Sequence, residues 1–151
     1  MKGVDLSHSL IPSWDVIALI AIELPSLERL ALKYVFVLAR SVCFHFHLIS
    51  NNRLRPPSDW KLVTDAFSRL TELQLNGTLM DWQSVMNVIT LMPRLNQLES
   101  GYNRLQALTS LTSKHPVLTV TTINLDCNQL SCWAEVLQAL SPFQKCSHYH
   151  R

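Results

Sequence analysis

Glycine is scarce in this sequence, with three residues in a chain of 151, and charged residues make up only 16% of it. So few glycines exclude a glycine-rich phosphate-binding loop, which needs several of them at fixed spacing. The net charge of +2 does not indicate a nucleic-acid-binding surface. No catalytic triad or cysteine–histidine pair stands in a recognisable sequence setting. These absences predict a protein that is not an enzyme, uses no cofactor and binds no nucleic acid.

The four cysteines form no C-x-x-C pair, although Cys127 and Cys132 lie close together in the sequence. We interpret them as small buried hydrophobic side chains of an intracellular protein rather than as disulfide partners. The N-terminal sequence MKGVDLSHSL carries an acid and polar residues where a signal peptide needs an apolar run. A cytoplasmic protein is therefore expected. Its length and its 48% of hydrophobic residues predict one domain with a core.

Histidine occurs at alternate positions in two places, as His45-x-His47 and as Cys146-x-His148-x-His150. Within a strand, residues two apart point to the same side, so each group can present its side chains together. A structural zinc site needs four ligands, and nothing in the sequence places the two groups side by side. The sequence therefore predicts no metal site.

Leucine recurs at fixed spacing along most of the chain. The leucine-rich repeat template L-x-x-L-x-L-x-x-N-x-L is matched completely by residues 120–130. Residues 95–105 match it with Ser100 in place of the third leucine, and in two other copies a hydroxyl replaces the asparagine of position nine, at Ser9 and Thr78. Copies one to five of the template begin at Met1, Leu27, Leu70, Leu95 and Val120. Phe143 is expected to begin a sixth copy that the chain end cuts off.

A second series supports this pattern, because each of the four tryptophans begins a similar segment. The segments are WDVIALIA from Trp14, WKLVTDAF from Trp60, WQSVMNVI from Trp82 and WAEVLQAL from Trp133. Each has a valine or isoleucine at the fourth place and apolar residues at the seventh and eighth, which is the spacing of one helix face. We therefore expect four helices, with the tryptophans in the core of the helical layer.

Together the two series predict an α/β leucine-rich repeat solenoid. It has about five repeats of 25–26 residues, a concave parallel sheet, convex tryptophan-led helices and uncapped ends. The expected domain covers 1–145 as a fragment, interrupted by an apolar insertion at 34–50 and followed by an irregular tail at 146–151. Position nine turns inward, and its amides satisfy backbone groups of the turns; the predicted ladder consists of Asn52, Asn103 and Asn128.

Side chains between the leucines alternate in direction along each strand, so they should lie on the concave face. Solenoids commonly bind proteins through that face, and this expectation is an analogy of fold. The candidate protein-binding residues are polar and mildly acidic, with one aromatic: Asp5, His8, Arg29, Glu72, Gln74, Asn76, Gln97, Glu99, Tyr102, Asn124 and Asp126. The alternative is a solvated face without a partner.

Two runs combine the template with a tryptophan-led helix, namely LTELQLNGTLMDWQSVMNVITLMPRLNQLESGYNRL and TINLDCNQLSCWAEVLQALSPFQK. In this combination the chain resembles the leucine-rich region of tubulin-folding cofactor E, also called tubulin-specific chaperone E. The resemblance covers most of the chain except 34–50 and the tail CSHYHR. It implies a non-enzymatic protein that binds α-tubulin and helps assemble or dissociate the tubulin heterodimer with other cofactors.

Members of this family usually also carry a glycine-rich CAP-type domain before the repeats and a ubiquitin-like domain after them. Neither is visible here, and Met1 falls on the first position of a repeat, so we expect a fragment or an imperfect gene model. The expected partner is a protein, by resemblance α-tubulin, and the chain is expected to be a monomer that binds no membrane. A generic leucine-rich adaptor or regulatory subunit and a nonfunctional fragment stay open as alternatives.

The intervals between copies agree closely except for one, which runs from the second copy to the third. That interval is too long by about the length of YVFVLARSVCFHFHLIS at 34–50, and this segment, the most apolar stretch of the chain, lies within it. A membrane helix needs roughly 20 apolar residues, and this run is shorter and contains Arg40. A native insertion this apolar would expose a patch unless it found cover.

A translated intron is the sharper hypothesis for this segment. The codons of Lys33 to Val35 can spell a common intron start, and those of Ile49 and Ser50 can spell a common intron end. Excision would join Leu32 to a new asparagine followed by residues 51–54. It would place Asn52 on position nine and bring the long interval back to the length of the first one.

Overall fold

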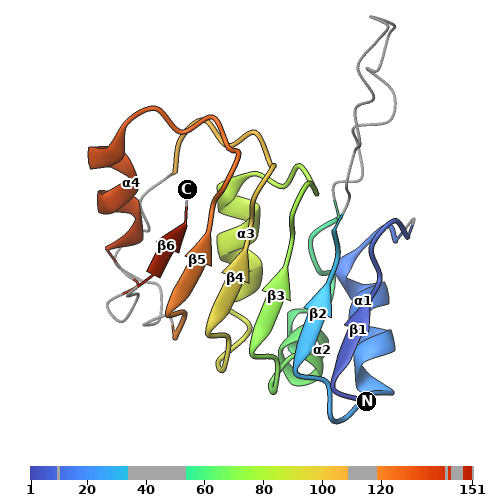
Figure 1. Ribbon diagram of the computed structural model, residues 1–151. Coiled ribbons are helices and arrows are strands. Elements are labelled where there is room, and N and C mark those ends of the chain that lie inside the picture. The colour runs from blue at the N-terminus through green and yellow to red at the C-terminus, as the bar shows by residue number, and fades with distance from the viewer. Residues whose placement is uncertain (10, 34–53, 109–118, 142, 144–147, 151) are drawn as a thin grey trace, which may run out of the picture.

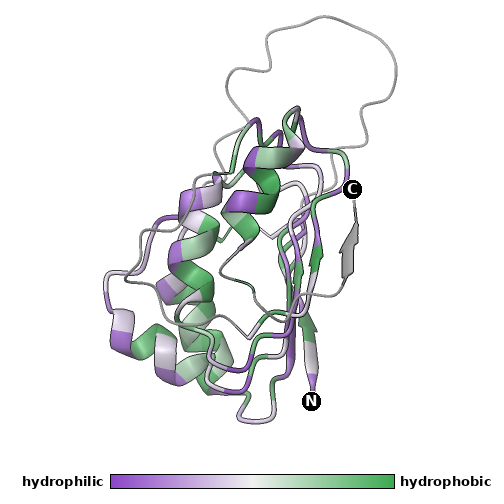
Figure 2. Ribbon diagram, turned by 90° about the vertical axis from the view of Figure 1, so that its left-hand side faces the viewer, coloured by the Kyte–Doolittle hydropathy of each residue, from purple (hydrophilic) through white to green (hydrophobic). Residues whose placement is uncertain are grey.

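The computed structural model describes residues 1–9, 11–33, 54–108, 119–141, 143 and 148–150. Within these ranges the chain has an α/β architecture with one parallel sheet of six strands, whose order in space follows their order along the chain. The helices cover one face of the sheet and leave the other face open, as Figure 1 and Figure 2 show. The strands are β1 (Gly3–Asp5), β2 (Arg29–Ala31), β3 (Glu72–Gln74), β4 (Gln97–Glu99), β5 (Thr122–Asn124) and β6 (His148–His150). The helices are α1 (Trp14–Ile22), α2 (Trp60–Ala66), α3 (Trp82–Ile89) and α4 (Trp133–Leu140).

The core lies between the sheet and the helices. The central residues of β2 to β5 are Leu30, Leu73, Leu98 and Ile123, and each is at most 1% exposed. They stack from strand to strand because register partners hold the same template position, as Leu30 with Leu73 and Leu98 with Ile123. A single short strand could not bury its apolar side chain alone, so the core depends on stacking.

Each of the four described helices begins at a tryptophan, which confirms that part of the sequence prediction. An acid before the tryptophan caps two of them. Asp59 Oδ1 accepts a hydrogen bond from the Leu62 N–H at 2.9 Å, and Asp81 Oδ1 accepts one from the Ser84 N–H at 2.9 Å. These bonds satisfy backbone amides that have no partner within the first helical turn.

The tryptophans themselves divide into two kinds. Trp14 is fully buried and meets the Phe67 ring edge-on at 6.0 Å between centroids, and Trp82 is 2% exposed. Trp60 and Trp133 are 44% and 48% exposed, so the expectation that they lie in the core is wrong. The reason is the small contact of their helices: α3 buries five of its residues, whereas α4 buries three and α2 buries one.

The expectation of an irregular tail at 146–151 is wrong for residues 148–150, which form β6 and pair in parallel with β5. Without β6, the backbone donors and acceptors along the free edge of β5 would be open to pairing. Phe143 is buried, and its N–H donates to the Leu140 carbonyl at 2.9 Å, as the Leu95 N–H does to Met92 at 3.1 Å. Phe143 thus resembles a first-position residue, although β6 begins farther along the chain from it than β4 does from Leu95.

The apolar segment 34–50 lies outside the described residues, and so do His45, His47, Asn52 and Cys146. The interpretations of this segment, and the absence of a metal site there, therefore stay predictions. In the described part of the chain, no helix combines the length and the apolar character that a membrane span requires.

Candidate protein-binding surface

All eleven residues predicted to bind a protein lie along the open face of the sheet or in the turns that follow its strands. Four are in the last position of a strand and three are in the first, which are the two positions that point away from the helices. The others follow in turns: His8, Asn76, Tyr102 and Asp126. Solvent reaches all eleven, because none of them is buried. The eleven residues thus lie on one side of the sheet, and that they bind a protein stays a prediction.

Glu99 lies at the centre of the largest group of contacts on this face. Its Oε2 accepts a hydrogen bond from Asn76 Nδ2 at 2.8 Å, and its Oε1 accepts from Gln74 Nε2 and Gln97 Nε2 at 3.4 Å each. The same Gln74 amide donates to the Glu72 carboxylate. The side chain of Glu99 is only 20% exposed. Three amides thus hold this carboxylate in one orientation, and five of the predicted residues form one connected group.

Lys33 is a further member of the open face that the sequence analysis did not name. Its Nζ lies 4.0 Å from Glu99 Oε2, and its side chain is 34% exposed. Its backbone N–H donates to Ser7 Oγ at 3.0 Å, which fixes the chain at the end of β2. Lys33 holds template position seven, the position of Asn76. Counting the template one residue past Leu32 in the second copy would have identified Lys33 as an open-face residue.

Asp5 and Asn124 hold the same template position and form the same turn. Asp5 Oδ1 accepts from the Ser7 N–H at 2.8 Å, and Asn124 Oδ1 accepts from the Asp126 N–H at 2.8 Å. Hydrogen bonds from the Ser7 hydroxyl and amide hold the pKa of Asp5 below its ordinary value of 3.8. Asp5 is thus ionised at neutral pH and contributes negative charge at the N-terminal edge of the face.

Template position eight adopts a left-handed backbone in each copy where the structure describes it. The φ angle is 61° at His8, 68° at Gly77, 58° at Tyr102 and 55° at Cys127. A side chain at this φ normally costs about 1–2 kcal/mol, so the surrounding turn must impose the conformation. The glycine is the only sequence signal for it. The consequence is that Tyr102 stands 62% exposed at the rim of the open face.

Cys127 lies beside Tyr102 on the next turn. A hydrogen bond with the Cys127 side chain raises the pKa of Tyr102, and the nearby charge of Asp126 acts in the same direction. Cys127 and Cys132 are both exposed free thiols, so the interpretation of these two as buried hydrophobic side chains is wrong. Cys127 occupies an outward-facing turn, and Cys132 is the N-cap residue of α4.

Asparagine side chains support the turns from within, as the sequence predicts for Asn103, which is buried, and for Asn128, which is partly buried. Asn103 Nδ2 donates to the Leu75 carbonyl at 2.9 Å, and its Oδ1 accepts from the Leu79 N–H at 2.7 Å. Asn128 Oδ1 accepts from the N–H groups of Asn103 and Leu105, each at 3.0 Å. These four bonds each join one copy to the copy before it. The asparagine side chains therefore fix the backbone of the turns that follow β3 and β4, and these turns carry Asn76 and Tyr102 of the open face.

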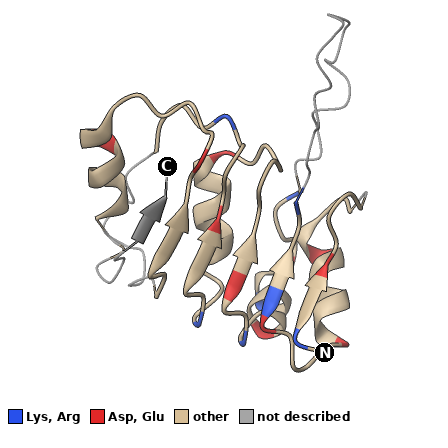
Figure 3. Cartoon of the chain, in the orientation of Figure 1, with Lys and Arg blue, Asp and Glu red and all other residues tan. Residues whose placement is uncertain are grey.

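Charge is distributed unevenly over the face. Acidic positions lie on β3 and β4, and a basic position lies on β2 (Figure 3). Among the eleven residues four are acidic and one is arginine, whereas the whole chain has a net charge of +2. Within the residues that the structure describes, no group of three histidine, cysteine or acidic side chains is arranged to hold a metal ion. The surface offers fixed hydrogen-bonding groups and negative charge.

The structure is an α/β array in which strand–helix units stack side by side along one parallel sheet. The open face of this sheet is polar. Comparison with curated proteins gives the particular relatives. The chain is 28% identical over 131 residues to the tubulin-specific chaperone E of Danio rerio, which is 87% of this chain and 22% of that protein. It is 35% identical over 98 residues to the tubulin-specific chaperone E of Mus musculus, which is 65% of this chain and 16% of that protein.

These comparisons confirm the resemblance to tubulin-specific chaperone E that the sequence analysis identified. The aligned part of this chain spans about a fifth of the length of these curated relatives. No protein-family model matches the chain. No solved structure matches it.

Proposed function

We propose that this chain is a leucine-rich repeat module of about five repeats that binds tubulin, through α-tubulin, as part of tubulin folding and assembly. The observation that carries the proposal is the Glu99-centred open face, in a chain similar to a tubulin-specific chaperone. Binding requires no bond chemistry, so we propose that the chain acts without catalysis. We also propose that it works in the cytoplasm as a monomer.

The open face is suited to binding because its polar groups are already held in place. The amides of Gln74, Asn76 and Gln97 orient the Glu99 carboxylate, so a partner need not order it on docking. Tyr102 supplies a large side chain at the rim, and exposed tyrosines are frequent anchors of protein interfaces. The acidic balance of the face favours a partner surface with basic groups.

The direct test measures association of the full chain with purified tubulin heterodimer by biolayer interferometry. The chain is expected to bind, and Glu72→Lys is expected to raise the Kd by roughly tenfold, because it reverses one charge on the face. Glu135→Lys is the matched control. It makes the same charge change on α4, on the opposite side of the sheet, and should leave the Kd unchanged.

Three outcomes separate the alternatives. A folded chain that does not bind tubulin rejects the tubulin proposal and favours a generic adaptor with another protein partner. Equal losses from Glu72→Lys and Glu135→Lys would show that tubulin binds elsewhere than the open face. A chain that does not fold, judged by circular dichroism, supports the alternative of a nonfunctional fragment.

A further inference from the structure

Asp126 differs from the other acids of the open face in what its carboxylate contacts. Asp5, Glu72 and Glu99 each accept at least one hydrogen bond from a nearby amide. Asp126 Oδ1 is shielded from solvent and accepts no hydrogen bond from any residue that the structure describes. An acceptor in this position has lost its water without gaining a donor, which is unfavourable for folding. The residue as a whole is only partly buried, so its carboxylate stays within reach of a partner.

The same template position is satisfied elsewhere on the face. Asn76 holds position seven of the third copy, and its Oδ1 accepts from the Gly101 N–H of the fourth copy at 2.8 Å. Asp126 holds position seven of the fifth copy, and the described part of the chain supplies no equivalent donor. Because this acceptor is charged, a cationic donor would bind it more strongly than a neutral one.

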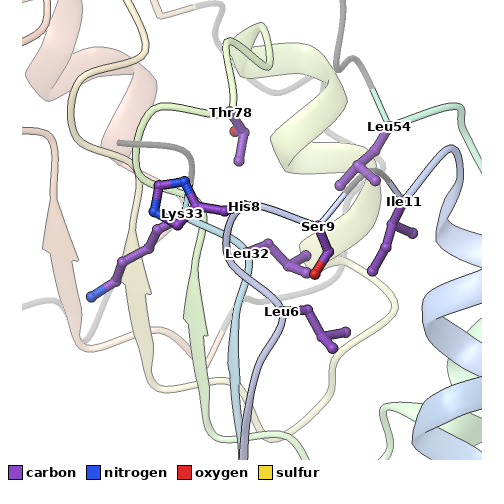
Figure 4. Close-up of a pocket in the computed structure, with 8 residues that line it drawn as sticks. All are labelled: Leu6, His8, Ser9, Ile11, Leu32, Lys33, Leu54 and Thr78. Carbon is purple, nitrogen blue, oxygen red and sulfur yellow. The ribbon is translucent and has the colours of Figure 1, made fainter. Parts of the chain in front are cut away.

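The basic members of the open face lie away from Asp126. Arg29 begins β2, and Lys33 follows that strand, whereas Asp126 follows β5. Lys33 and His8 line a pocket formed by the first three copies (Figure 4), and Lys33 forms its ion pair with Glu99 at 4.0 Å. Among the described residues, no basic side chain lies within ion-pair distance of Asp126. The described part of the chain therefore does not neutralise this carboxylate.

Tyr102 supplies an aromatic ring beside the same turn. Its N–H donates to the Asp126 carbonyl at 2.8 Å, so the two residues are in contact through their backbones. A hydrogen bond joins its side chain to that of Cys127, the residue after Asp126, and the side chain stays largely exposed. The ring is therefore held beside the turn that carries Asp126, with much of its surface open to solvent. A cation that contacts the carboxylate can also stack on this ring, as arginine does on aromatic faces.

We infer that Asp126 and Tyr102 form a seat for an arginine side chain of the protein partner. The carboxylate accepts hydrogen bonds from the guanidinium N–H groups, and the ring stacks on the guanidinium plane. Charge complementarity identifies the occupant as basic, and the ring favours a planar guanidinium over an ammonium group. The inference rests on the proposed function, because it names the group by which the open face holds its partner.

One substitution should weaken binding without weakening the fold. Asp126→Asn removes the charge and keeps the size of the side chain. It should raise the Kd for tubulin heterodimer about tenfold, because the guanidinium loses its charged acceptor. The thermal midpoint of the free chain should stay the same or rise, because Oδ1 has no described donor to lose. Asp65→Asn, at an exposed acid on α2, is the matched control and should change neither quantity.

Tyrosine variants test the other half of the seat. Tyr102→Leu should raise the Kd about fivefold, and Tyr102→Phe should raise it less, because it keeps the ring. If both residues hold one arginine, the losses from Tyr102→Leu and Asp126→Asn should not multiply in the double variant. Losses that multiply fully would place the two residues in separate contacts and would overturn the inference.

An octa-arginine peptide separates this seat from the proposed function. By fluorescence anisotropy, the parent chain and Asp65→Asn should bind the labelled peptide more tightly than Asp126→Asn does. If this holds and the parent chain does not bind tubulin, the seat stands and the tubulin proposal fails. If Glu72→Lys weakens tubulin binding and Asp126→Asn does not, the tubulin proposal stands and the seat is overturned. A thermal midpoint that falls in Asp126→Asn also overturns it, because the chain itself would then be using the carboxylate.

Discussion

The side chain of Asn76 joins Glu99 to the turn that follows it. Asn76 Nδ2 donates to Glu99 Oε2 at 2.8 Å, and Asn76 Oδ1 accepts from the Gly101 N–H at 2.8 Å. Gly101 allows this approach because a Cβ there would lie 3.3 Å from Asn76 Oδ1 and 3.1 Å from the Asp126 carbonyl. One amide in the turn after β3 thus holds both the central carboxylate of the open face and the backbone beside it.

Replacing this amide by a carboxylate should destabilise the chain. Asn76→Asp removes the donor to Glu99 and places two negative charges side by side, so we expect a loss of about 1–3 kcal/mol of unfolding free energy at pH 7. The loss should shrink near pH 4, where carboxylates begin to be protonated. Urea denaturation at the two pH values measures it. Gln106→Glu makes the same chemical change at an exposed amide, and an equal loss there would contradict the prediction.

The asparagine ladder should carry a large share of the stability of the turns. Asn103→Ala removes one of the bonds to the Leu75 carbonyl and takes the side-chain acceptor away from the Leu79 N–H, and an unsatisfied buried group costs about 1–3 kcal/mol. Asn103→Thr should cost less. Thr78 holds the same template position in the copy before, and its hydroxyl donates to the carbonyl three residues earlier, that of Leu75, at 2.9 Å. Urea midpoints rank the variants. Equal midpoints for the alanine and threonine variants would reject this account.

The two kinds of tryptophan should respond differently to the same substitution. Trp82→Ala opens a cavity beside Phe143, whose ring lies 6.4 Å away between centroids, and should cost about 3–5 kcal/mol. Trp133→Ala starts from a side chain that is 48% exposed and should cost much less. Denaturation of both variants provides the comparison, with each serving as the control for the other. A larger loss at Trp133 would mean that the described packing of α3 is wrong.

The link between α1 and α2 should make stability depend on pH. Asp15 accepts hydrogen bonds from the Ser58 N–H and hydroxyl, each at 3.0 Å. Partial loss of solvent raises the pKa of Asp15, but the bonds from Ser58 and Asp59 outweigh it and hold that pKa below 3.8. The stabilisation is therefore complete above pH 3.8 and is lost as the pH falls through the lower pKa of the folded state.

Asp15→Asn replaces the titrating carboxyl by an amide that does not ionise. The variant should be less stable than the parent chain at pH 6, and the difference in urea midpoint should narrow as the pH is lowered below 3.8. Asp65→Asn, at an exposed acid on α2, is the matched control. If the difference between parent and Asp15→Asn stays constant from pH 6 to pH 2.5, the proposed link does not contribute.

The sequence predicted the repeating parts of this structure well because their causes are local or periodic. The spacing of Leu73 and Leu98 indicates the sheet register, since stacked copies must align equal positions to bury them. The helix starts follow from tryptophan-led apolar faces, and Asp59 and Asp81 supply caps in the residue before the helix. The seven open-face residues that lie within strands follow from the alternation of side chains along each strand.

Other properties were decided by tertiary structure. Trp82 and Trp133 hold the same place in their segments, and only the contact of each helix with the core determines which is buried. The left-handed conformation of Tyr102 comes from the turn that contains it, since tyrosine has no preference for it. The approach of Lys33 to Glu99 joins the second copy to the fourth, which no pattern within one copy indicates.

The sequence by itself thus determined the α/β fold, the helix starts, the polar face and the asparagines that support it. It did so because a repeated template records the same local environment several times. Tertiary structure decided which side chains of the face touch, which tryptophans are buried, and that β6 pairs with β5. These contacts depend on the distances between different copies and on whether the edge of a strand is free. A single copy of the template carries no information on either.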